Sequence, residues 1–195
     1  MGIRERHRAQ MFRDIRDAAL DLVEAQGLAA TTISHIASRV GISERTVFRY
    51  YASKEDALMP AQTGLVASMT EVKPAGVDAA GILADLVETF RENFAFEVAS
   101  GVFRRITRLL VKEPELMRFV ARQERDLVEA LGASLIELDQ LPPTRAMLLA
   151  EVATAVWRVA WQSFARDELA GITSNPMDHF DEAARELGQL FQPAG

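Results

Sequence analysis

The chain has 195 residues, 49% hydrophobic and 26% charged, which is typical of a globular protein and excludes a disordered one. It has a net charge of −6 and no cysteine, which excludes disulfides, thiolate zinc sites and a cysteine nucleophile. No apolar run approaches the roughly 20 residues that span a bilayer, and no secretory signal is recognisable at the start. We therefore expect a cytoplasmic protein with no membrane partner.

The first helix is expected from about Ala9 to Gln26, since its apolar residues recur at helical spacing and Gly27 follows as a stop signal. The eight residues before it form a basic arm that contains Arg4, Arg6 and Arg8. Two interpretations of this arm remain open: a frayed, solvated terminus, or a segment that contacts DNA phosphates or the minor groove.

The charge is divided unevenly along the chain. Residues 1–59 contain nine Lys or Arg and eight Asp or Glu, whereas residues 60–195 contain 13 and 20, respectively. DNA responds to the local field, screened over about 8–10 Å in physiological salt, rather than to the total charge. A basic DNA-binding face near the N-terminus is therefore compatible with an acidic protein.

Two very short helices joined by a glycine turn are expected between Thr32 and Tyr51. Thr32 can cap the first helix and Ser43 the second, while Gly41 suits the left-handed conformation that ends a helix. Helices this short are unstable alone. Joined by a tight turn, they are typical of the helix-turn-helix that places one helix in the DNA major groove.

This segment resembles the N-terminal domain of the TetR (tetracycline repressor-like) family of bacterial transcription regulators. The resemblance covers about the first third of the chain and is specific in residue type and spacing; the rest resembles the family only in length and helical character. The positions that carry it are Ala18, Ala19, Leu20, Gly27, Thr31, Thr32, Ile36, Ala37, Val40, Gly41, Ile42, Ser43, Thr46, Val47, Phe48, Tyr50, Tyr51, Ser53, Lys54, Glu55 and Leu58.

The expected fold is all-α, with about nine helices and no convincing strand pattern. The resemblance implies a three-helix DNA-binding domain over residues 1–58, followed by an effector-binding and dimerisation domain over residues 59–195. A linking helix is expected over about residues 53–72, bent by Pro60. Later helices are expected at about residues 78–98, 102–111, 115–138, 144–170 and 175–191.

The resemblance also implies which residues contact DNA. Base reading is expected from Ser43, Glu44, Arg45 and Arg49, because Arg can bond guanine bidentately and Glu can accept from cytosine. Phosphate contacts are expected from Thr32, Ser34, Thr46, Tyr50 and Lys54, together with Arg4, Arg6 and Arg8 of the arm. The alternatives are that Glu44 and Arg45 form an exposed pair, that Thr46 is an additional cap, and that Lys54 is merely solvated.

The helix expected over residues 144–170 has too little polar surface for the outside of a small monomer. Family members dimerise through their last two helices, which implies a homodimer with a four-helix interface. The residues expected there are Met147, Ala150, Ala153, Phe180, Ala184, Leu187 and Phe191. The alternative is a core helix buried within a monomer.

An effector pocket is expected in the helical domain, since such pockets are mostly apolar with a few placed polar groups. Its expected lining is Phe90, Phe94, Phe103, Met117, Phe119, Trp157 and Trp161, with Glu151 and Arg158 as polar anchors. Ordinary core packing is the alternative for each aromatic residue. A basic cluster of Arg104, Arg105 and Arg108 could meet the phosphates of an acyl-CoA, or could be a solvated face.

The resulting hypothesis is a homodimeric repressor that binds a palindromic DNA operator in the bacterial nucleoid and is released by a small hydrophobic or aromatic effector, acyl-CoA included. The pattern does not separate repressor from activator. No cofactor, metal site or catalytic residue is expected, because His7, His35 and His179 are far apart and the glycines form no nucleotide-binding loop. The alternatives are a ligand-independent architectural DNA-binding protein and a helical-bundle enzyme that uses Glu151.

Overall fold

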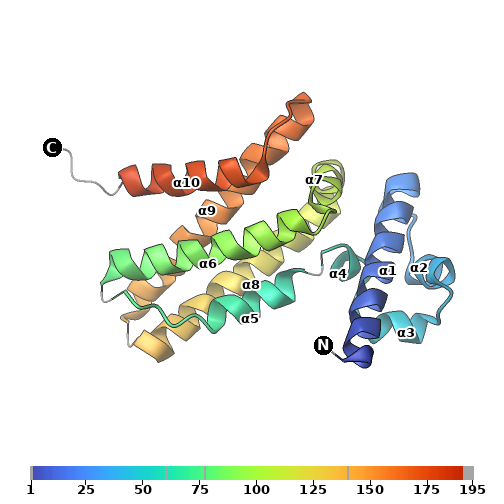
Figure 1. Cartoon of the computed structure of the whole chain (residues 1–195), viewed down its shortest axis with the longest axis horizontal. Helices are drawn as coiled ribbons and strands as arrows, with labels where there is room; N and C mark the ends of the chain where they lie inside the picture. The colour runs from blue at the N-terminus through green and yellow to red at the C-terminus, as the bar shows by residue number, and fades with distance from the viewer. Residues whose placement is uncertain (1, 60, 77, 140, 191–195) are drawn as a thin grey trace. The chain divides into compact units, whose positions relative to one another are not determined.

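The structure is a computed structural model that describes residues 2–59, 61–76, 78–139 and 141–190. Within these residues every regular element is an α-helix, so the all-α prediction is confirmed (Figure 1). The helices are α1 (Ile3–Gln26), α2 (Ile33–Val40), α3 (Glu44–Phe48), α4 (Lys54–Leu58), α5 (Ala61–Thr70), α6 (Ala79–Ala99), α7 (Phe103–Lys112), α8 (Pro114–Asp139), α9 (Pro143–Ala170) and α10 (Pro176–Leu190).

The described residues form ten helices rather than nine, because the expected linking helix is divided into α4 and α5. Met59, which ends α4, has left the helical region with φ −123° and ψ 56°. A residue that precedes proline is sterically disfavoured in the helical conformation, which accounts for the interruption. Pro60 itself, expected to bend a continuous helix, lies outside the described residues.

The N-terminal arm is also helical, since α1 begins at Ile3 rather than near Ala9. At this end the backbone N–H of Gly2 donates to Oε2 of Glu5 at 2.7 Å, which satisfies one of the donors that a helix start leaves unpaired. The frayed-terminus interpretation of the arm is therefore wrong, and the arm arginines occupy fixed positions around a helix.

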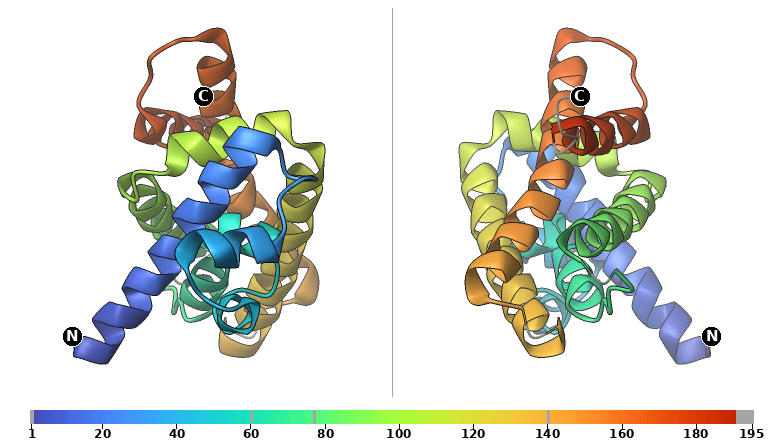
Figure 2. Two further views of the ribbon diagram at one scale, coloured as in Figure 1. Left: turned by 90° about the vertical axis from the view of Figure 1, so that its right-hand side faces the viewer. Right: turned by 90° about the vertical axis from the view of Figure 1, so that its left-hand side faces the viewer.

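The chain forms two compact units, the first comprising Met1–Ala61 with Leu109–Phe119 and the second Gln62–Arg108 with Val120–Gly195. In the first unit, α2 and α4 pack on α1, and α3 packs on α2 (Figure 2). Ile15 and Leu20 of α1, Ile36 of α2 and Val47 of α3 are all completely buried. Packing against α1 thus stabilises helices that are too short to persist alone.

The second unit is built around α9, which packs against α6 and α10. Four phenylalanines are completely buried in it, namely Phe90, Phe94, Phe164 and Phe180. At its edge the hydroxyl of Ser134 donates to the carbonyl oxygen of Thr70 at 2.8 Å, which joins α8 to the end of α5. Among the helices described, none is long and apolar enough to cross a membrane.

Candidate DNA interface and effector region

The helix-turn-helix is closed by local contacts that its sequence encodes. The hydroxyl oxygen of Thr32 accepts from the backbone N–H of His35 at 3.2 Å and caps α2. Gly41 ends α2 with φ 78° and ψ 33°, a conformation that costs glycine little and other residues more. The hydroxyl oxygen of Ser43 accepts from the N–H of Thr46 at 3.1 Å and caps α3. These caps fix the angle at which α3 leaves the turn.

α3 has a buried side and an exposed side. Val47 is completely buried, whereas Glu44, Arg45 and Arg49 are exposed, as expected of residues that read DNA bases. Phe48 is 54% exposed on the same short helix, and the predicted base-reading set omitted it. A solvent-exposed apolar side chain at this position is available for contact with the major groove of DNA.

Two hydroxyls expected at the DNA are already used within α3. The Ser43 and Thr46 hydroxyl oxygens lie 2.9 Å apart, and Ser43 is also the helix cap. The structure therefore agrees with the interpretation of Thr46 as an additional cap residue. Thr32 and Ser34 are exposed at the start of α2, where the hydroxyl of Thr32 is likewise engaged in capping.

Lys54, expected to contact a DNA phosphate, forms hydrogen bonds within the protein. Its ammonium group donates to the carbonyl oxygen of Leu28 at 2.6 Å and to that of Thr31 at 3.0 Å. Both acceptors lie in the turn between α1 and α2. Lys54 is thus a structural cross-link from α4 to this turn rather than a free surface charge.

A second cross-link to the same turn comes from Glu113, which the sequence analysis did not single out. Oε1 of Glu113 accepts from the backbone N–H of Leu28 at 3.1 Å. Leu28 is 1% exposed, so this carboxylate satisfies an N–H that water does not reach. Glu113 belongs to residues 109–119, the late segment that completes the first unit.

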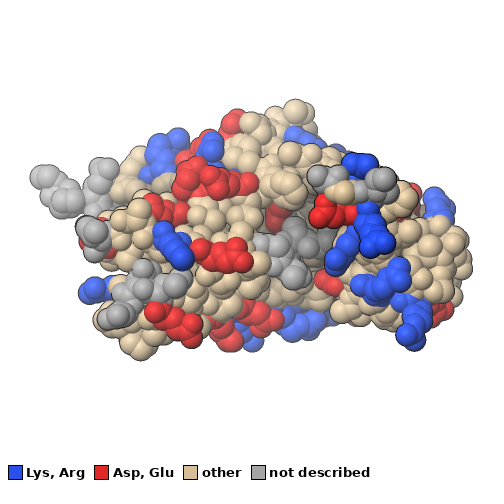
Figure 3. Space-filling view, turned by 60° about the horizontal axis from the view of Figure 1, so that its bottom comes forward, with Lys and Arg blue, Asp and Glu red and all other residues tan. Residues whose placement is uncertain are grey.

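The basic residues of the arm are exposed at the start of α1, where Arg4, Arg6 and Arg8 span little more than one turn of the helix. Tyr50 is half-buried, and its ring meets that of Phe12 edge-on with centroids 4.9 Å apart. Figure 3 shows Lys and Arg side chains predominating on the displayed face of the α1–α4 region, whereas carboxylates are frequent elsewhere.

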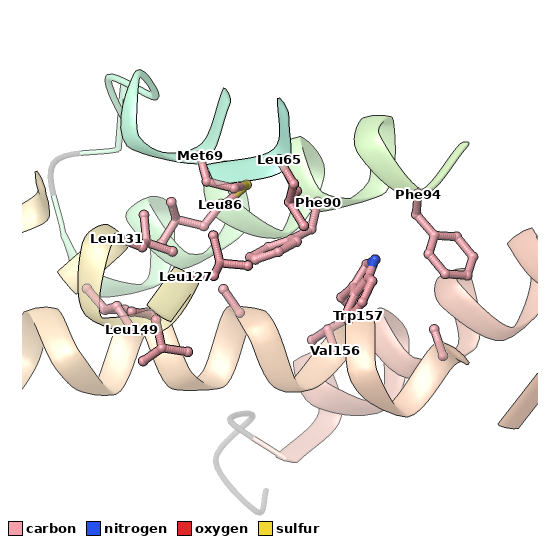
Figure 4. Close-up of a cluster of buried hydrophobic side chains, with 14 of the residues drawn as sticks. Leu65, Met69, Leu86, Phe90, Phe94, Leu127, Leu131, Leu149, Val156 and Trp157 are labelled. Atoms are coloured by element: carbon pink, nitrogen blue, oxygen red, sulfur yellow. The ribbon is translucent and has the colours of Figure 1, made fainter. Parts of the chain in front are cut away.

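The aromatic residues expected to line an effector pocket are divided between the units. Phe90, Phe94 and Trp157 are buried together in the second unit (Figure 4). Phe103 belongs to the same cluster, and Trp161 packs against it. Met117 and Phe119 instead belong to the first unit. Sequence spacing could not reveal this division, because α8 itself passes from one unit into the other.

The aromatic cluster is closely packed, as ring contacts show. The centroid of Phe94 lies 5.3 Å from that of Phe103 and 5.3 Å from that of Phe180. Within this apolar region, the indole Nε1 of Trp157 has no hydrogen-bond partner among the described residues, and neither has the hydroxyl of Thr154 one turn earlier. In Figure 4 the indole nitrogen points from α9 towards the interval between Phe90 and Phe94.

The charged groups of the second unit differ from the expected anchors. Glu151 is exposed, and Arg158 pairs with Glu124 rather than standing free. Burial raises the pKa of the Glu124 carboxyl, against the opposing effect of Arg158. Desolvation also raises the pKa of Glu97, on α6, to about 7. In both carboxyls, burial is the main cause of the raised pKa.

Two arginines of the basic cluster on α7 are paired within the protein, although their side chains remain 41% and 62% exposed. Arg104 and Arg108 both pair with Glu168 of α9, whose side chain is only 7% exposed. The guanidinium of Arg104 also lies 4.9 Å from the ring centroid of Phe164 and donates to the carbonyl oxygen of Ser174. This ion pair holds α7 to α9.

Three residues expected at a dimer interface are buried within one chain. Ala150 and Ala153 of α9 and Phe180 of α10 have no exposed surface, because all three pack into the core cluster of their own unit. A different side of α9 forms an open groove with α10, of about 510 Å³, whose lining includes Val152, Val159 and Leu187. Of the other expected residues, Met147 is 40% exposed, Ala184 is half-buried, and Phe191 lies outside the described residues.

The comparisons agree with this architecture. The family model "Bacterial regulatory proteins, tetR family" matches residues 15–58, the helix-turn-helix and its flanks. The chain is 28% identical over 171 residues to the HTH-type transcriptional regulator TcmR of Streptomyces glaucescens, covering 81% of this chain and 74% of TcmR. It is 25% identical over 195 residues to MftR of Mycobacterium tuberculosis, a candidate mycofactocin biosynthesis transcriptional regulator, covering 96% of each.

A solved structure of a candidate TetR-family transcriptional regulator from Syntrophomonas wolfei superposes with a TM-score of 0.61. The two chains are 16% identical, and the match covers 96% of this chain and 99% of that one. This protein belongs to the TetR family. It is therefore a transcriptional regulator, and nothing among its described residues suggests a metal centre.

In this TetR-family regulator, we expect Glu113→Ala to loosen the turn between α1 and α2. The buried N–H of Leu28 would lose its acceptor, at a cost of about 1–3 kcal/mol. Amide exchange at Leu28 should accelerate in Glu113→Ala but not in Glu113→Gln, which retains Oε1. The control is Glu115→Ala, since Glu115 is exposed and only 3.7 Å from Arg118. Unchanged exchange in Glu113→Ala would contradict the assigned role.

Proposed function

We propose that this TetR-family regulator is a homodimeric repressor that binds a palindromic operator and is released by a small, mainly apolar effector. Residues 1–58 would bind DNA, and residues 59–195 would bind the effector and a second copy. The observation that carries the proposal is the exposed side of α3, which presents Glu44, Arg45 and Phe48 opposite the buried Val47. Such a surface on a capped helix-turn-helix suits the major groove.

Each exposed side chain of α3 can contact a different chemical group on the edge of a base pair. Arg45 can donate two hydrogen bonds to guanine, Glu44 can accept from cytosine, and Phe48 can contact the methyl group of thymine. Thr32, Ser34 and Tyr50 are placed to contact the DNA backbone from the rim of the helix-turn-helix, as are the arm arginines on α1. Sequence preference would therefore come from α3, and general affinity from the residues around it.

A second copy of the chain is the proposed occupant of the α9–α10 groove. Its rim carries Val159, which is 45% exposed, and the α10 residues Ala183 and Leu187. A twofold axis through such a groove would pair α9 and α10 with their copies in a four-helix interface. Two α3 helices related by that axis would read half-sites about one DNA turn apart.

The aromatic core of the second unit is the proposed effector region. Its apolar lining supports a hydrophobic or aromatic ligand, and the unpartnered indole N–H of Trp157 supports one that carries a hydrogen-bond acceptor. An acyl-CoA is less well supported, because Arg104 and Arg108 already pair with Glu168. We therefore favour a neutral aromatic ligand with a carbonyl oxygen.

The continuity of α7 and α8 supports a route by which effector binding releases the protein from DNA. Each of these helices contributes residues to both units. A ligand that repositions the second-unit part of either helix would act on residues 109–119 and hence on the Leu28 turn held by Glu113. Releasing DNA about 100-fold requires roughly 2.7 kcal/mol of differential ligand binding, which is within ordinary allosteric coupling.

Arg45→Ala should relax the base preference of the protein at one position of each half-site. The loss of a bidentate contact is worth about 1–3 kcal/mol of discrimination against the wrong base pair. Selection of duplexes from a random library, followed by competition binding, measures this preference. The control is Arg39→Ala, since Arg39 on α2 lies 3.5 Å from Asp21 of α1. An undiminished preference in Arg45→Ala, or a wild-type protein that selects no duplex, would contradict the proposal.

Val159→Asp should convert the dimer to a monomer, because it places a charge in the apolar groove of α9 and α10. Sedimentation velocity measures the change in mass. Operator binding should weaken by at least about 100-fold, since linking two heads raises avidity by that order. Leu169→Asp is the matched control, as Leu169 is 67% exposed on the same helix and is not among the groove-lining residues. A dimeric Val159→Asp protein would refute this interface.

Trp157→Phe should weaken effector binding by about 5- to 10-fold, as expected from the loss of one buried hydrogen bond. The test is a thermal-shift screen of neutral aromatic ketones, aromatic carboxylates and acyl-CoAs, with hits assayed for DNA release. Trp161→Phe is the control, because it makes the same change one turn later on α9. Equal effects of the two changes would contradict the assigned N–H contact. If no compound alters DNA affinity, a ligand-independent regulator is the better interpretation.

A further inference from the structure

Four buried polar atoms of the second unit have no hydrogen-bond partner among the described residues. They are Oγ1 of Thr107, Oε1 of Gln123, Oγ1 of Thr154 and Nε1 of Trp157. Thr107 and Thr154 have no exposed surface, so bulk water does not reach their hydroxyls. A buried polar group without a partner is costly, and proteins seldom keep one without a use. These atoms therefore indicate where a polar molecule from outside the chain can bind.

Both threonines lack the internal partner that a helix ordinarily offers. A threonine within an α-helix can donate to the carbonyl oxygen one turn earlier, and Thr89 of α6 does so to Asp85 at 3.0 Å. Thr107 and Thr154 lie within α7 and α9, yet neither hydroxyl makes such a bond. Their hydroxyls therefore remain free to bind a ligand.

Three of the four atoms lie on adjacent turns of α8 and α9. Arg158 of α9 pairs with Glu124 of α8, which brings these two turns together. Gln123 directly precedes Glu124, and Trp157 directly precedes Arg158. Thr154 is three residues before Trp157 and so shares its side of α9. One small molecule can therefore reach Gln123 and Trp157 together.

The surroundings of these atoms are apolar and rich in aromatic rings. Leu127, one turn after Gln123, belongs to the same core cluster as Trp157 (Figure 4). Phe103, one turn before Thr107, belongs to that cluster as well. Sites with this composition bind ligands that have aromatic or other apolar parts and a few polar groups.

The four atoms differ in the hydrogen bonds that they can form. The indole N–H of Trp157 can only donate, the amide oxygen of Gln123 can only accept, and a threonine hydroxyl can do either. A ligand that only accepts, such as a simple ketone, would satisfy Trp157 and leave Gln123 Oε1 unpaired. A complementary ligand therefore carries a donor as well as an acceptor.

The charged groups of this region do not favour an anionic ligand. Arg158 is already paired with Glu124. Glu97 follows Phe90 by seven residues, so it lies on the same side of α6 two turns further along the helix. A carboxylate would meet a paired arginine and an acidic side chain, whereas a hydroxyl group would meet neither attraction nor repulsion of this kind.

We propose that the effector is a hydroxylated aromatic ketone that accepts a hydrogen bond from Trp157 and donates one to Gln123. The inference rests on the effector-binding function proposed above, to which it adds a donor on the ligand and a selecting residue on α8. Gln123 lies four residues beyond Phe119, where the first-unit segment of α8 ends. A ligand bound to Gln123 would therefore act on the helix that continues into that segment.

The first test needs no ligand. Thr107→Val and Thr154→Val each replace an unpartnered hydroxyl with a methyl group, so neither change removes a hydrogen bond. We expect the melting temperature of the full chain to stay unchanged or rise by up to about 4 °C in each. Thr89→Val is the matched control, since it loses the bond to Asp85. Losses in both variants as large as in Thr89→Val would overturn the proposal.

The second test compares two probes of similar size, para-hydroxybenzophenone and para-fluorobenzophenone, of which only the first has a donor. Isothermal titration calorimetry should show wild type binding the hydroxyl compound at least about 5-fold more tightly, as expected for one neutral hydrogen bond. Gln123→Met should reduce this preference to less than about 2-fold. Trp157→Phe should weaken both compounds by similar factors, because it removes the contact with the ketone that they share.

Thr89→Val is the control here too and should retain the wild-type preference. Failure of para-hydroxybenzophenone to bind more tightly than para-fluorobenzophenone would overturn the proposal, as would an undiminished preference in Gln123→Met. A merely structural role of Gln123 would instead weaken both compounds equally and leave their ratio unchanged.

Failure of this inference is distinguishable from failure of the proposed function. If both compounds bind equally and release DNA, only the requirement for a donor is wrong, and release by an apolar effector stands. If no compound of the wider hydrophobic screen changes DNA affinity, the effector-binding function itself fails.

Discussion

The peptide groups around Leu28 are the point on which the DNA-binding unit depends. The carbonyl of Leu28 accepts from the ammonium of Lys54, while its N–H donates to the carboxylate of Glu113. These two charged side chains come from segments 26 and 85 residues away, and they meet at the turn that directs α2 away from α1. Charge-assisted hydrogen bonds to a buried peptide are among the stronger polar contacts in proteins. The orientation of the helix-turn-helix therefore depends in part on Glu113, which lies between α7 and α8, beyond the expected DNA-binding domain.

The second unit uses polar groups differently. Its ion pairs, such as Arg158 with Glu124, connect neighbouring helices near the surface, whereas its interior leaves Trp157 Nε1 and the Thr154 hydroxyl without protein partners. Unpartnered polar groups in an apolar region are costly, and natural proteins seldom keep them without a use. Charged contacts join helices or turns in both units, whereas only the second unit holds buried polar side-chain atoms that have no partner among the described residues. This contrast supports the division of function between the two units.

Sequence reasoning succeeded where the determining contact is local. The caps at Thr32 and Ser43 and the left-handed Gly41 are each decided within about four residues, and all were predictable. It failed where partners are distant in sequence. Nothing near Lys54 indicates that its ammonium reaches the Leu28 turn, and Ala150 looks the same in sequence whether it faces its own core or a second chain. Helical periodicity identifies an apolar face but not the neighbour that covers it.

The two ends of α3 have different surroundings, and this difference bears on how the protein can search DNA. Its N-terminal residues Glu44 and Arg45 are exposed, whereas Arg49 beyond its last turn stacks on Tyr50 beside the basic start of α1. Backbone contacts of the latter kind act on every duplex and can hold the protein in register before any base is read. An acidic chain gains little from long-range attraction to DNA, so exposed arginines beside the reading helix would compensate where contact occurs. Such arginines lie on the first turns of α1 and directly after the last residue of α3.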